Sequence, residues 1–212
     1  MILAHAAGRL RAHARAVGVR AGVLGYRPPY SFDGAVWDGE YARGALDFYR
    51  DVSEAPRYGI LAAYLGAISP RSIVDIGCGV GILRQRIDHL RFEQYVGLDV
   101  SPVAIEEARA AADGRSTFLV GERPGPELGR FDVAVCNEVL YYVDRPDDLL
   151  AVLRDAIVPG GHLLTSIWRH PGDAVLHRMV EARFDFVDGV SLASLSQVGR
   201  RWRVALHRVR PT

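Results

Sequence analysis

The sequence predicts an α/β fold built on a doubly wound sheet of about seven strands, mostly parallel, with an antiparallel C-terminal edge strand. Two observations support this prediction. From residue 53 onward, strand-like and helix-like segments alternate, which favours parallel strands joined by right-handed crossovers. The stretch SIVDIGCGVGILRQRI, residues 72–87, also places glycine at every second position directly after a buried strand. Such a turn is typical of α/β domains that bind a small molecule beyond the carboxyl ends of their strands.

Composition indicates one globular domain without a dominant charge. The chain has 212 residues, 49% of them hydrophobic, and its 26 basic and 25 acidic residues give a net charge of +1. This balance creates no overall field that would attract nucleic acid or a membrane surface. The two cysteines, Cys78 and Cys136, lack the spacing of metal ligands or of a disulfide framework, so we predict no metal site and a cytoplasmic location.

The N-terminal segment differs in composition from the rest of the chain. Residues 1–32 contain five arginines (Arg9, Arg11, Arg15, Arg20 and Arg27) and no acidic residue. A helix packed on the domain, a targeting peptide and an RNA-binding arm all have this pattern, and the first is favoured. The tract RPPYSFDGAVWDGEY, residues 27–41, is expected to form turns and loops because prolines and glycines interrupt it. We therefore divide the chain into an N-terminal helical arm and lid, 1–52, and a main domain, 53–212.

The elements of the main domain follow from periodicity. A helix is expected from residue 53 to the Ser69-Pro70 pair, because Ile60, Leu61, Tyr64, Leu65 and Ile68 recur at helical spacing. Strands are predicted at 72–77, 95–100, 117–120, 131–136 and 162–168, and helices at 101–112 and 145–157. Ser101 with Pro102 is a typical N-cap, and Pro159-Gly160-Gly161 should end the later helix. The last two runs, 184–192 and 200–209, are predicted to be adjacent antiparallel strands at one edge.

The glycine turn and a downstream aspartate predict the kind of ligand. Glycine at 77, 79 and 81 permits positive φ and lets a ligand lie against bare backbone. Asp99 ends the next strand, 24 residues after Asp75, where a carboxylate can accept hydrogen bonds from both hydroxyls of a ribose. The dinucleotide fingerprint requires a third glycine at position 82, but that residue is Ile82. A different nucleoside cofactor is therefore indicated.

The pattern Asp75-x-Gly77-x-Gly79-x-Gly81 resembles motif I of the class I S-adenosylmethionine-dependent methyltransferases. The resemblance continues through YVGLDVS, RFDVAVCNEVLYYVDRPDDLL and VPGGHLLTSIW, covering roughly residues 54–170. The segments CNEVLYYV and RYGILAAYL are most similar to the nodulation protein S type of small-molecule methyltransferase. The resemblance implies a Rossmann-like sheet of seven strands with an antiparallel last strand, and S-adenosyl-L-methionine as cofactor.

The same resemblance implies roles for individual residues. The motif I aspartate and glycine loop would hold the methionine part of the cofactor, Asp99 the ribose, and Val100 and Glu122 the adenine. The backbone carbonyl of Asn137 would face the cofactor's amino group. Arg57 is either the partner of the cofactor carboxylate or a residue of a solvated helix face. The candidate cofactor-binding residues are Arg57, Asp75, Gly77, Cys78, Gly79, Gly81, Asp99, Val100, Glu122 and Asn137.

Catalytic and acceptor-binding candidates are fewer, because methyl transfer depends mainly on positioning. Among the histidines, only His170 is expected at the active rim of the sheet. Glu138, Tyr141 and Tyr142 follow the fourth strand; alternation predicts one tyrosine in the pocket and the other against a helix. Trp37 and Tyr41 are predicted to close over the cofactor from the lid.

The predicted activity is transfer of a methyl group to oxygen or nitrogen of a small molecule, such as a sugar-containing or secondary metabolite. A nucleic-acid methyltransferase is the first alternative, but its Pro-Pro-aromatic motif should follow the fourth strand, whereas RPPY occupies residues 27–30. A protein that binds the cofactor without transferring methyl groups remains the second alternative. The sequence predicts neither the acceptor nor the oligomeric state.

Overall fold

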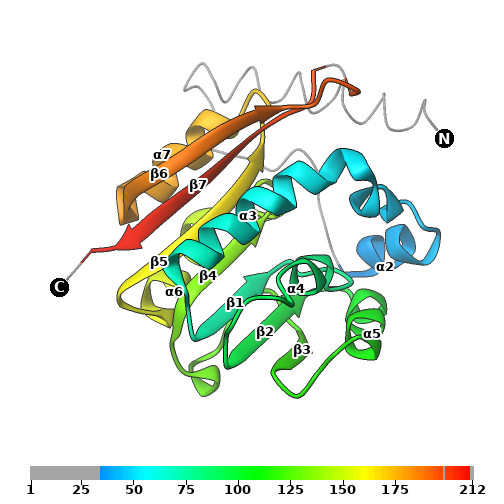
Figure 1. Cartoon of the computed structure of the whole chain (residues 1–212), viewed down its shortest axis with the longest axis horizontal. Coiled ribbons are helices and arrows are strands. Elements are labelled where there is room, and N and C mark those ends of the chain that lie inside the picture. The colour runs from blue at the N-terminus through cyan, green and yellow to red at the C-terminus, as the bar shows by residue number, and fades with distance from the viewer. Residues whose placement is uncertain (1–33, 198, 211–212) are drawn as a thin grey trace.

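The computed structural model describes residues 34–197 and 199–210, and in this part of the chain seven strands form one sheet (Figure 1). The strand order is β3-β2-β1-β4-β5-β7-β6. Strands β1 to β5 are parallel to one another, whereas β7 is antiparallel to both β5 and β6. The strands are β1 Ser72–Ile76, β2 Gln94–Asp99, β3 Ser116–Val120, β4 Phe131–Asn137, β5 Ile157–Trp168, β6 Phe184–Ala193 and β7 Arg201–Val209. The predicted fold class is confirmed, but the antiparallel C-terminal strand lies second from the edge, and β6 forms the edge.

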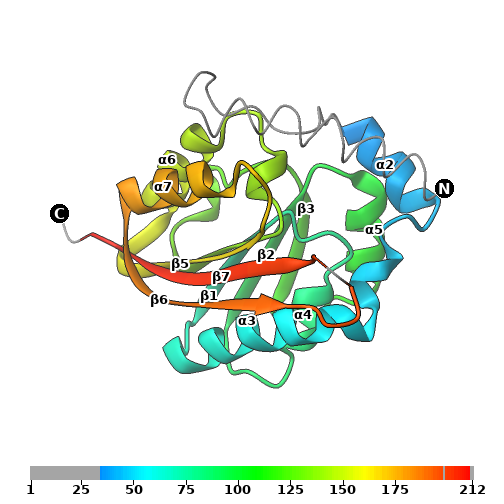
Figure 2. The same cartoon turned by 90° about the horizontal axis from the view of Figure 1, so that it is seen from above.

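Helices cover both faces of the sheet, as Figure 2 shows with α6 and α7 on one side and α3 and α4 on the other. Apolar side chains of α3, α4 and α5 pack on one face of the sheet, and those of α6 and α7 pack on the opposite face. The α-helices are α2 Gly34–Ala42, α3 Ala55–Ile68, α4 Ile82–Arg86, α5 Pro102–Ala110, α6 Pro146–Ala156 and α7 Asp173–Arg183. Short 3₁₀ helices are η1 Asp47–Arg50, η2 Val52–Glu54, η3 Pro126–Leu128 and η4 Leu140–Tyr142. None of the helices in the described part of the chain is long and apolar enough to cross a membrane.

Local signals explain the ends of several elements. The Ser101 hydroxyl accepts a hydrogen bond from the backbone N–H of Ala104 at 3.2 Å, which caps α5 as predicted. The prediction for Pro159-Gly160-Gly161 is wrong, because α6 already ends at Ala156 and these three residues lie within β5. The pairing of β5 with β4 moves from Ile157 to His162 while β4 advances only two residues, so the Pro-Gly-Gly tract forms a bulge.

The tract predicted to be turns and loops is partly helical. Residues 34–42 form α2, which packs against α5, whereas residues 27–33 and the rest of the basic arm lie outside the described residues. Gly34 does not interrupt the helix; it allows close packing, because a Cβ there would lie 3.0 Å from the carbonyl oxygen of Val100. The loop prediction failed because the glycines were interpreted as breaks instead of contact points. The domain boundary at residue 52 stays a prediction.

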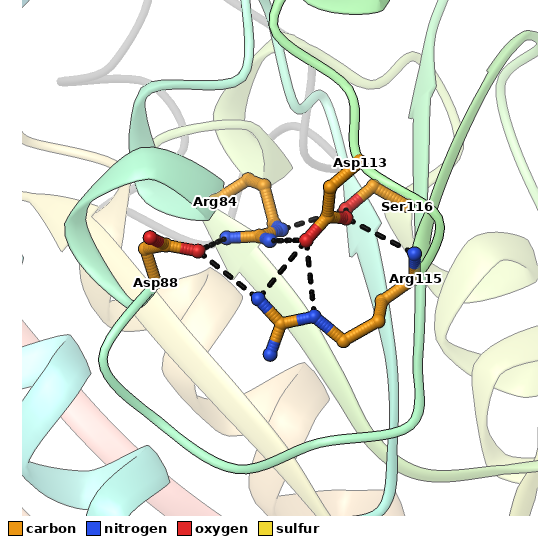
Figure 3. Close-up of polar contacts among 5 residues, drawn as sticks. All are labelled: Arg84, Asp88, Asp113, Arg115 and Ser116. Carbon is orange, nitrogen blue, oxygen red and sulfur yellow. Dashed lines mark hydrogen bonds and ion pairs between the residues drawn. The ribbon is translucent and has the colours of Figure 1, made fainter.

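A charged cluster fastens α4, the helix that directly follows the glycine loop, to the start of β3 (Figure 3). Arg84, almost fully buried, donates to Ser116 Oγ at 2.7 Å, to Asp113 at 2.7 Å and to Asp88 at 3.1 Å. Arg115 adds bonds to the same two carboxylates. Every charged group drawn in the cluster has a partner, so its role is structural.

Candidate active site

A cavity of about 350 Å³ lies beyond the carboxyl ends of β1, β2 and β4. Its floor comes from the ends of these strands and the glycine loop, and its cover comes from α2 and η1. Most of the predicted cofactor residues line it: Asp75, Gly77, Cys78, Gly79, Asp99, Val100, Glu122 and Asn137. The location agrees with the rule that ligands of open α/β sheets bind at this edge.

The glycine loop takes backbone conformations that favour glycine. Gly77, Gly79 and Gly81 have φ of +67°, +55° and +77°. The space beside the first two is occupied by protein, because a Cβ at Gly77 would lie 2.6 Å from Val139 and one at Gly79 would lie 2.8 Å from the Tyr41 hydroxyl. Gly81 does not line the cavity and instead precedes α4. The side chains of Val139 and Tyr41 therefore occupy part of the space in which a ligand was expected to lie against bare backbone.

Asp75 carries an unsatisfied carboxylate oxygen at the base of the cavity. The side chain is 1% exposed, and its Oδ2 accepts a hydrogen bond from the Tyr95 hydroxyl at 2.5 Å. Its Oδ1 has no partner within the described residues. Burial raises the pKa of Asp75 to about 7. A buried acceptor without a partner is costly, so a ligand with a donor or a positive charge is expected to meet it.

Asp99 organises the loop that faces it. Its Oδ2 accepts from the backbone N–H of Gly79 at 2.9 Å, and its Oδ1 accepts from that of Ser101 at 2.9 Å. Burial raises the pKa of Asp99, and these backbone hydrogen bonds oppose the rise. A carboxylate oxygen can accept two hydrogen bonds, so Asp99 retains the capacity to accept bonds from two ribose hydroxyls.

Glu138 is a second buried carboxylate, held in a strained backbone conformation. It lines the cavity, is 7% exposed and has φ of +61°, which is uncommon for a residue other than glycine. Its side chain accepts hydrogen bonds from Ser166 Oγ at 2.7 Å and from the Tyr141 hydroxyl at 2.9 Å. Burial raises the pKa of Glu138, and the positive charge of Arg57 opposes the rise.

Arg57 does not reach the cavity, and neither predicted role for it is supported. Its side chain is fully buried, which contradicts a solvated helix face. It donates to Glu54 at 2.9 and 3.1 Å and to the Asn137 side-chain oxygen, so these donors are already paired with protein acceptors. Arg200 binds the other oxygen of Glu54 at 2.7 Å. Arg57 therefore holds the end of β4 in place through its hydrogen bond to Asn137.

His170 and Tyr141 also lie outside the cavity lining. The ring of His170 packs edge-on against Tyr141, and its Nδ1 accepts from the backbone N–H of Gly172 at 3.1 Å. The prediction of His170 as the base at the active rim is therefore wrong, because the chain after β5 turns its ring inward. Tyr141 supports Glu138, whereas Tyr142 faces the cavity. One tyrosine of the pair thus lines the cavity, as predicted, whereas the other, predicted to lie against a helix, is buried against Glu138 and His170.

Aromatic side chains enclose the cavity. Trp37 and Tyr41 reach it from α2 as predicted, and Trp37 meets Tyr142 edge-on with ring centroids 4.9 Å apart. Tyr49 of η1 and Tyr58 of α3 also line it, but the sequence analysis missed them. Tyr58 had a signal, because it occupies the buried face of a periodic helix; Tyr49 had none, because η1 has no apolar period.

Comparison with known proteins assigns the family. A family model described as a methyltransferase domain matches residues 49–207. The chain belongs to this family. Within the described residues of this methyltransferase domain, no group of three or more histidine, cysteine, aspartate or glutamate residues is placed to hold a metal ion.

Curated relatives share part of the chain. The mitochondrial ubiquinone biosynthesis O-methyltransferase of Schizosaccharomyces pombe is 38% identical over 105 residues, which are 46% of this chain and 38% of that protein. The chain spans about half or less of the length of the curated relatives it matches.

Solved structures share the fold of the methyltransferase domain. The N-methyltransferase NodS from Bradyrhizobium japonicum WM9, in complex with S-adenosyl-L-homocysteine, has a TM-score of 0.65 at 20% identity, covering 77% of this chain and 90% of that one. The [4+2]-cyclase SpnF has a TM-score of 0.63 at 18% identity, covering 74% and 81%. The predicted Rossmann-like methyltransferase fold, and its similarity to the nodulation protein S type, are thereby confirmed.

Proposed function

We propose that this domain transfers a methyl group from S-adenosyl-L-methionine to a hydroxyl oxygen of a small molecule. The observation that carries the proposal is the buried, unpartnered Oδ1 of Asp75 in a cavity floored by the glycine loop. The curated relatives named as O-methyltransferases support oxygen over nitrogen as the acceptor atom. A sugar-containing or secondary metabolite as acceptor, and action in the cytoplasm, stay predictions; two buried free cysteines support the latter.

The residues present fit this cofactor. When bound, S-adenosyl-L-methionine supplies a methyl group activated by a positively charged sulfur. Asp75 provides an acceptor for the cofactor's ammonium group, and Asp99 has capacity for ribose hydroxyls. Asp75, Asp99 and Glu138 are all buried in the lining, so the interior of the cavity favours a positively charged ligand.

Glu138 is the group best placed to take the acceptor's proton. When the acceptor oxygen bonds to the methyl carbon, the carbon–sulfur bond of the cofactor would break with its electron pair passing to sulfur, which leaves S-adenosylhomocysteine. The acceptor's O–H proton would pass to a carboxylate oxygen of Glu138, and the O–H electron pair would stay on the oxygen. Ser166 and Tyr141 fix the carboxylate, and its raised pKa makes it a stronger base than an exposed glutamate. Trp37 and Tyr142 exclude water from this part of the cavity.

The test begins with cofactor binding, measured by calorimetry with S-adenosylhomocysteine and with NAD. Tighter binding of S-adenosylhomocysteine is expected, because Ile82 replaces the glycine that dinucleotides require. Preferential binding of NAD would overturn the cofactor assignment.

The second step is an acceptor screen with methyl-labelled cofactor, using phenolic, sugar and amine compounds and mass spectrometry of the products. Labelled O-methyl products and release of S-adenosylhomocysteine are expected. Products labelled only on nitrogen would refute oxygen as the acceptor atom. Cofactor binding without release across the whole screen would favour a non-methylating role, as the fold shared with the cyclase SpnF illustrates.

A further inference from the structure

Helix α2 lies over the cofactor end of the cavity but is weakly held by apolar packing. None of its residues is buried, and it contains two glycines, which are poor helix formers. It nevertheless contacts the cavity at close range, because Tyr41 sits over Gly79 and Gly34 lies against the carbonyl of Val100. Apart from the aromatic contact of Trp37 with Tyr142, specific polar contacts are therefore expected to hold α2 in this position.

Polar contacts from Asp38 supply that hold. Asp38 Oδ1 accepts a hydrogen bond from the hydroxyl of Ser101 and lies 3.4 Å from the backbone N–H of Val103, at the start of α5. Ser101 is fully buried, and its own N–H donates to Asp99. Asp99 in turn accepts from Gly79. One chain of hydrogen bonds thus joins α2, the cap of α5, the predicted ribose residue and the glycine loop.

The negative charge of Asp38 is unfavourable at this position, so attraction between opposite charges does not explain its role. Its negative charge raises the pKa of Asp99, so the two carboxylates repel each other. The benefit therefore lies in the hydrogen bonds that Asp38 accepts. An asparagine oxygen can accept the same bonds without the repulsion.

We propose that Asp38 is the positioning residue that latches α2 over the bound cofactor and so controls cofactor release. The latch connects to Asp99 through Ser101, and Asp99 binds Gly79, so opening α2 loosens the residues that would hold the nucleoside. The predicted lid role of the N-terminal segment is thereby assigned to α2 and to one side chain. The inference rests on the proposed cofactor.

The experiment compares Asp38→Ala, Asp38→Asn and a control, Glu40→Ala, in the full chain. Glu40 lies on the same helix and pairs with Arg43, but it does not line the cavity. The dissociation rate of S-adenosylhomocysteine is measured by surface plasmon resonance. Asp38→Ala is expected to raise the rate about tenfold, since the hydrogen bonds that Asp38 accepts are lost. Asp38→Asn and Glu40→Ala should remain within about twofold of the unmodified chain.

Hydrogen exchange separates a latch from a general loss of stability. With S-adenosylhomocysteine bound, amides of residues 34–42 should exchange faster in Asp38→Ala, while those of β1 and β4 stay protected. An unchanged dissociation rate, or an equal rise in Glu40→Ala, would overturn the inference. Unfolding of Asp38→Ala would leave Asp38→Asn as the test: a tenfold faster rate there would show that charge, and not hydrogen bonding, holds the helix. If the unmodified chain binds no S-adenosylhomocysteine, the proposed function fails, not the latch alone.

Discussion

Burial of the Asp75 carboxyl, with one oxygen unpaired, destabilises the folded state. A buried acceptor without a partner costs about 1–3 kcal/mol, and the Asp75 carboxyl also loses the hydration of its charge. Its raised pKa means that this group stabilises the folded state below the pKa of the unfolded chain, about 4, and loses that contribution as pH rises to about 7. We infer that Asp75 serves ligand binding and not stability at the end of β1.

Asp75→Asn is therefore expected to weaken binding of S-adenosylhomocysteine by about 1.5–3 kcal/mol, because the charged acceptor is lost. At pH 8 the free energy of unfolding should be unchanged or higher, since the neutral amide avoids burial of a charge. Calorimetry and urea unfolding measure the two quantities. Normal affinity in this variant would exclude Asp75 from the binding site.

Glu138 is expected to act on the chemical step alone. Glu138→Gln should lower kcat about 10²- to 10⁴-fold, the usual contribution of a general base, with little change in S-adenosylhomocysteine affinity. In the unmodified chain kcat/KM should rise with pH as the carboxyl loses its proton, at a pH above the usual glutamate range because burial raises the pKa. The glutamine variant should lack this rise. Steady-state kinetics across pH, with the acceptor found in the screen, measure both profiles. If Glu138→Gln showed the same pH profile as the unmodified chain, the assignment of Glu138 as the base would be refuted.

Between elements, α4 and the start of β3 meet through charges instead of a large apolar surface. The side chain of Arg84 is 7% exposed and serves two carboxylates and a serine, as Figure 3 shows. The pKa of Asp113 is held well below its usual value, mainly by the Ser116 hydroxyl and also by Arg115 and Arg84. This contribution is present above the unfolded pKa of about 4 and is lost as pH falls further.

Arg84→Met should lower the free energy of unfolding by about 1–3 kcal/mol, because two partly exposed carboxylates lose a buried partner. Arg71→Met is the matched control, since the Arg71–Glu93 pair is 77% and 66% exposed and should contribute little to stability. Urea unfolding gives both values. Equal losses in the two variants would show that burial of Arg84 adds nothing.

At the scale of the molecule, two buried histidines link stability to pH. His177 of α7 and His207 of β7 pack on the same side of the sheet, and burial lowers the pKa of each to about 4, assisted by the charge of Arg203. Their neutral forms stabilise the folded state above the unfolded pKa of about 6.5, and this contribution is lost as pH falls from 6.5 toward 4.

When pH is lowered from 7 to 5, the free energy of unfolding should therefore fall by about 1–2 kcal/mol less in His207→Leu than in the unmodified chain. Asp75 acts in the opposite direction over part of this range, so the difference between variants is informative and the absolute slope is not. His89→Gln, at an exposed position, should follow the unmodified chain. Urea unfolding at both pH values tests this, and identical pH losses in all three proteins would contradict it.

The sequence by itself determined the sheet, the glycine loop and the main ligand-facing residues. Strand and helix periods locate β1 to β5, and parallel strands place their carboxyl ends at one edge, so Asp75, Asp99, Asn137 and Glu138 had to converge there. Motif I also predicted positive φ at its three glycines. These features depend on short stretches of sequence and on the geometry of parallel strands, which is why they could be read without a structure.

Only the tertiary structure decided which polar side chains reach the cavity. Arg57 is buried because Glu54 binds it and Arg200, 146 residues away from Glu54 in sequence, binds the same carboxylate. The ring of His170 turns inward onto Tyr141, and α2 forms where its glycines meet α5. Each outcome depends on a partner distant in the chain. A local pattern records a residue's own periodicity and not the charge or surface that it will meet after folding, so such contacts had to be observed in the folded molecule.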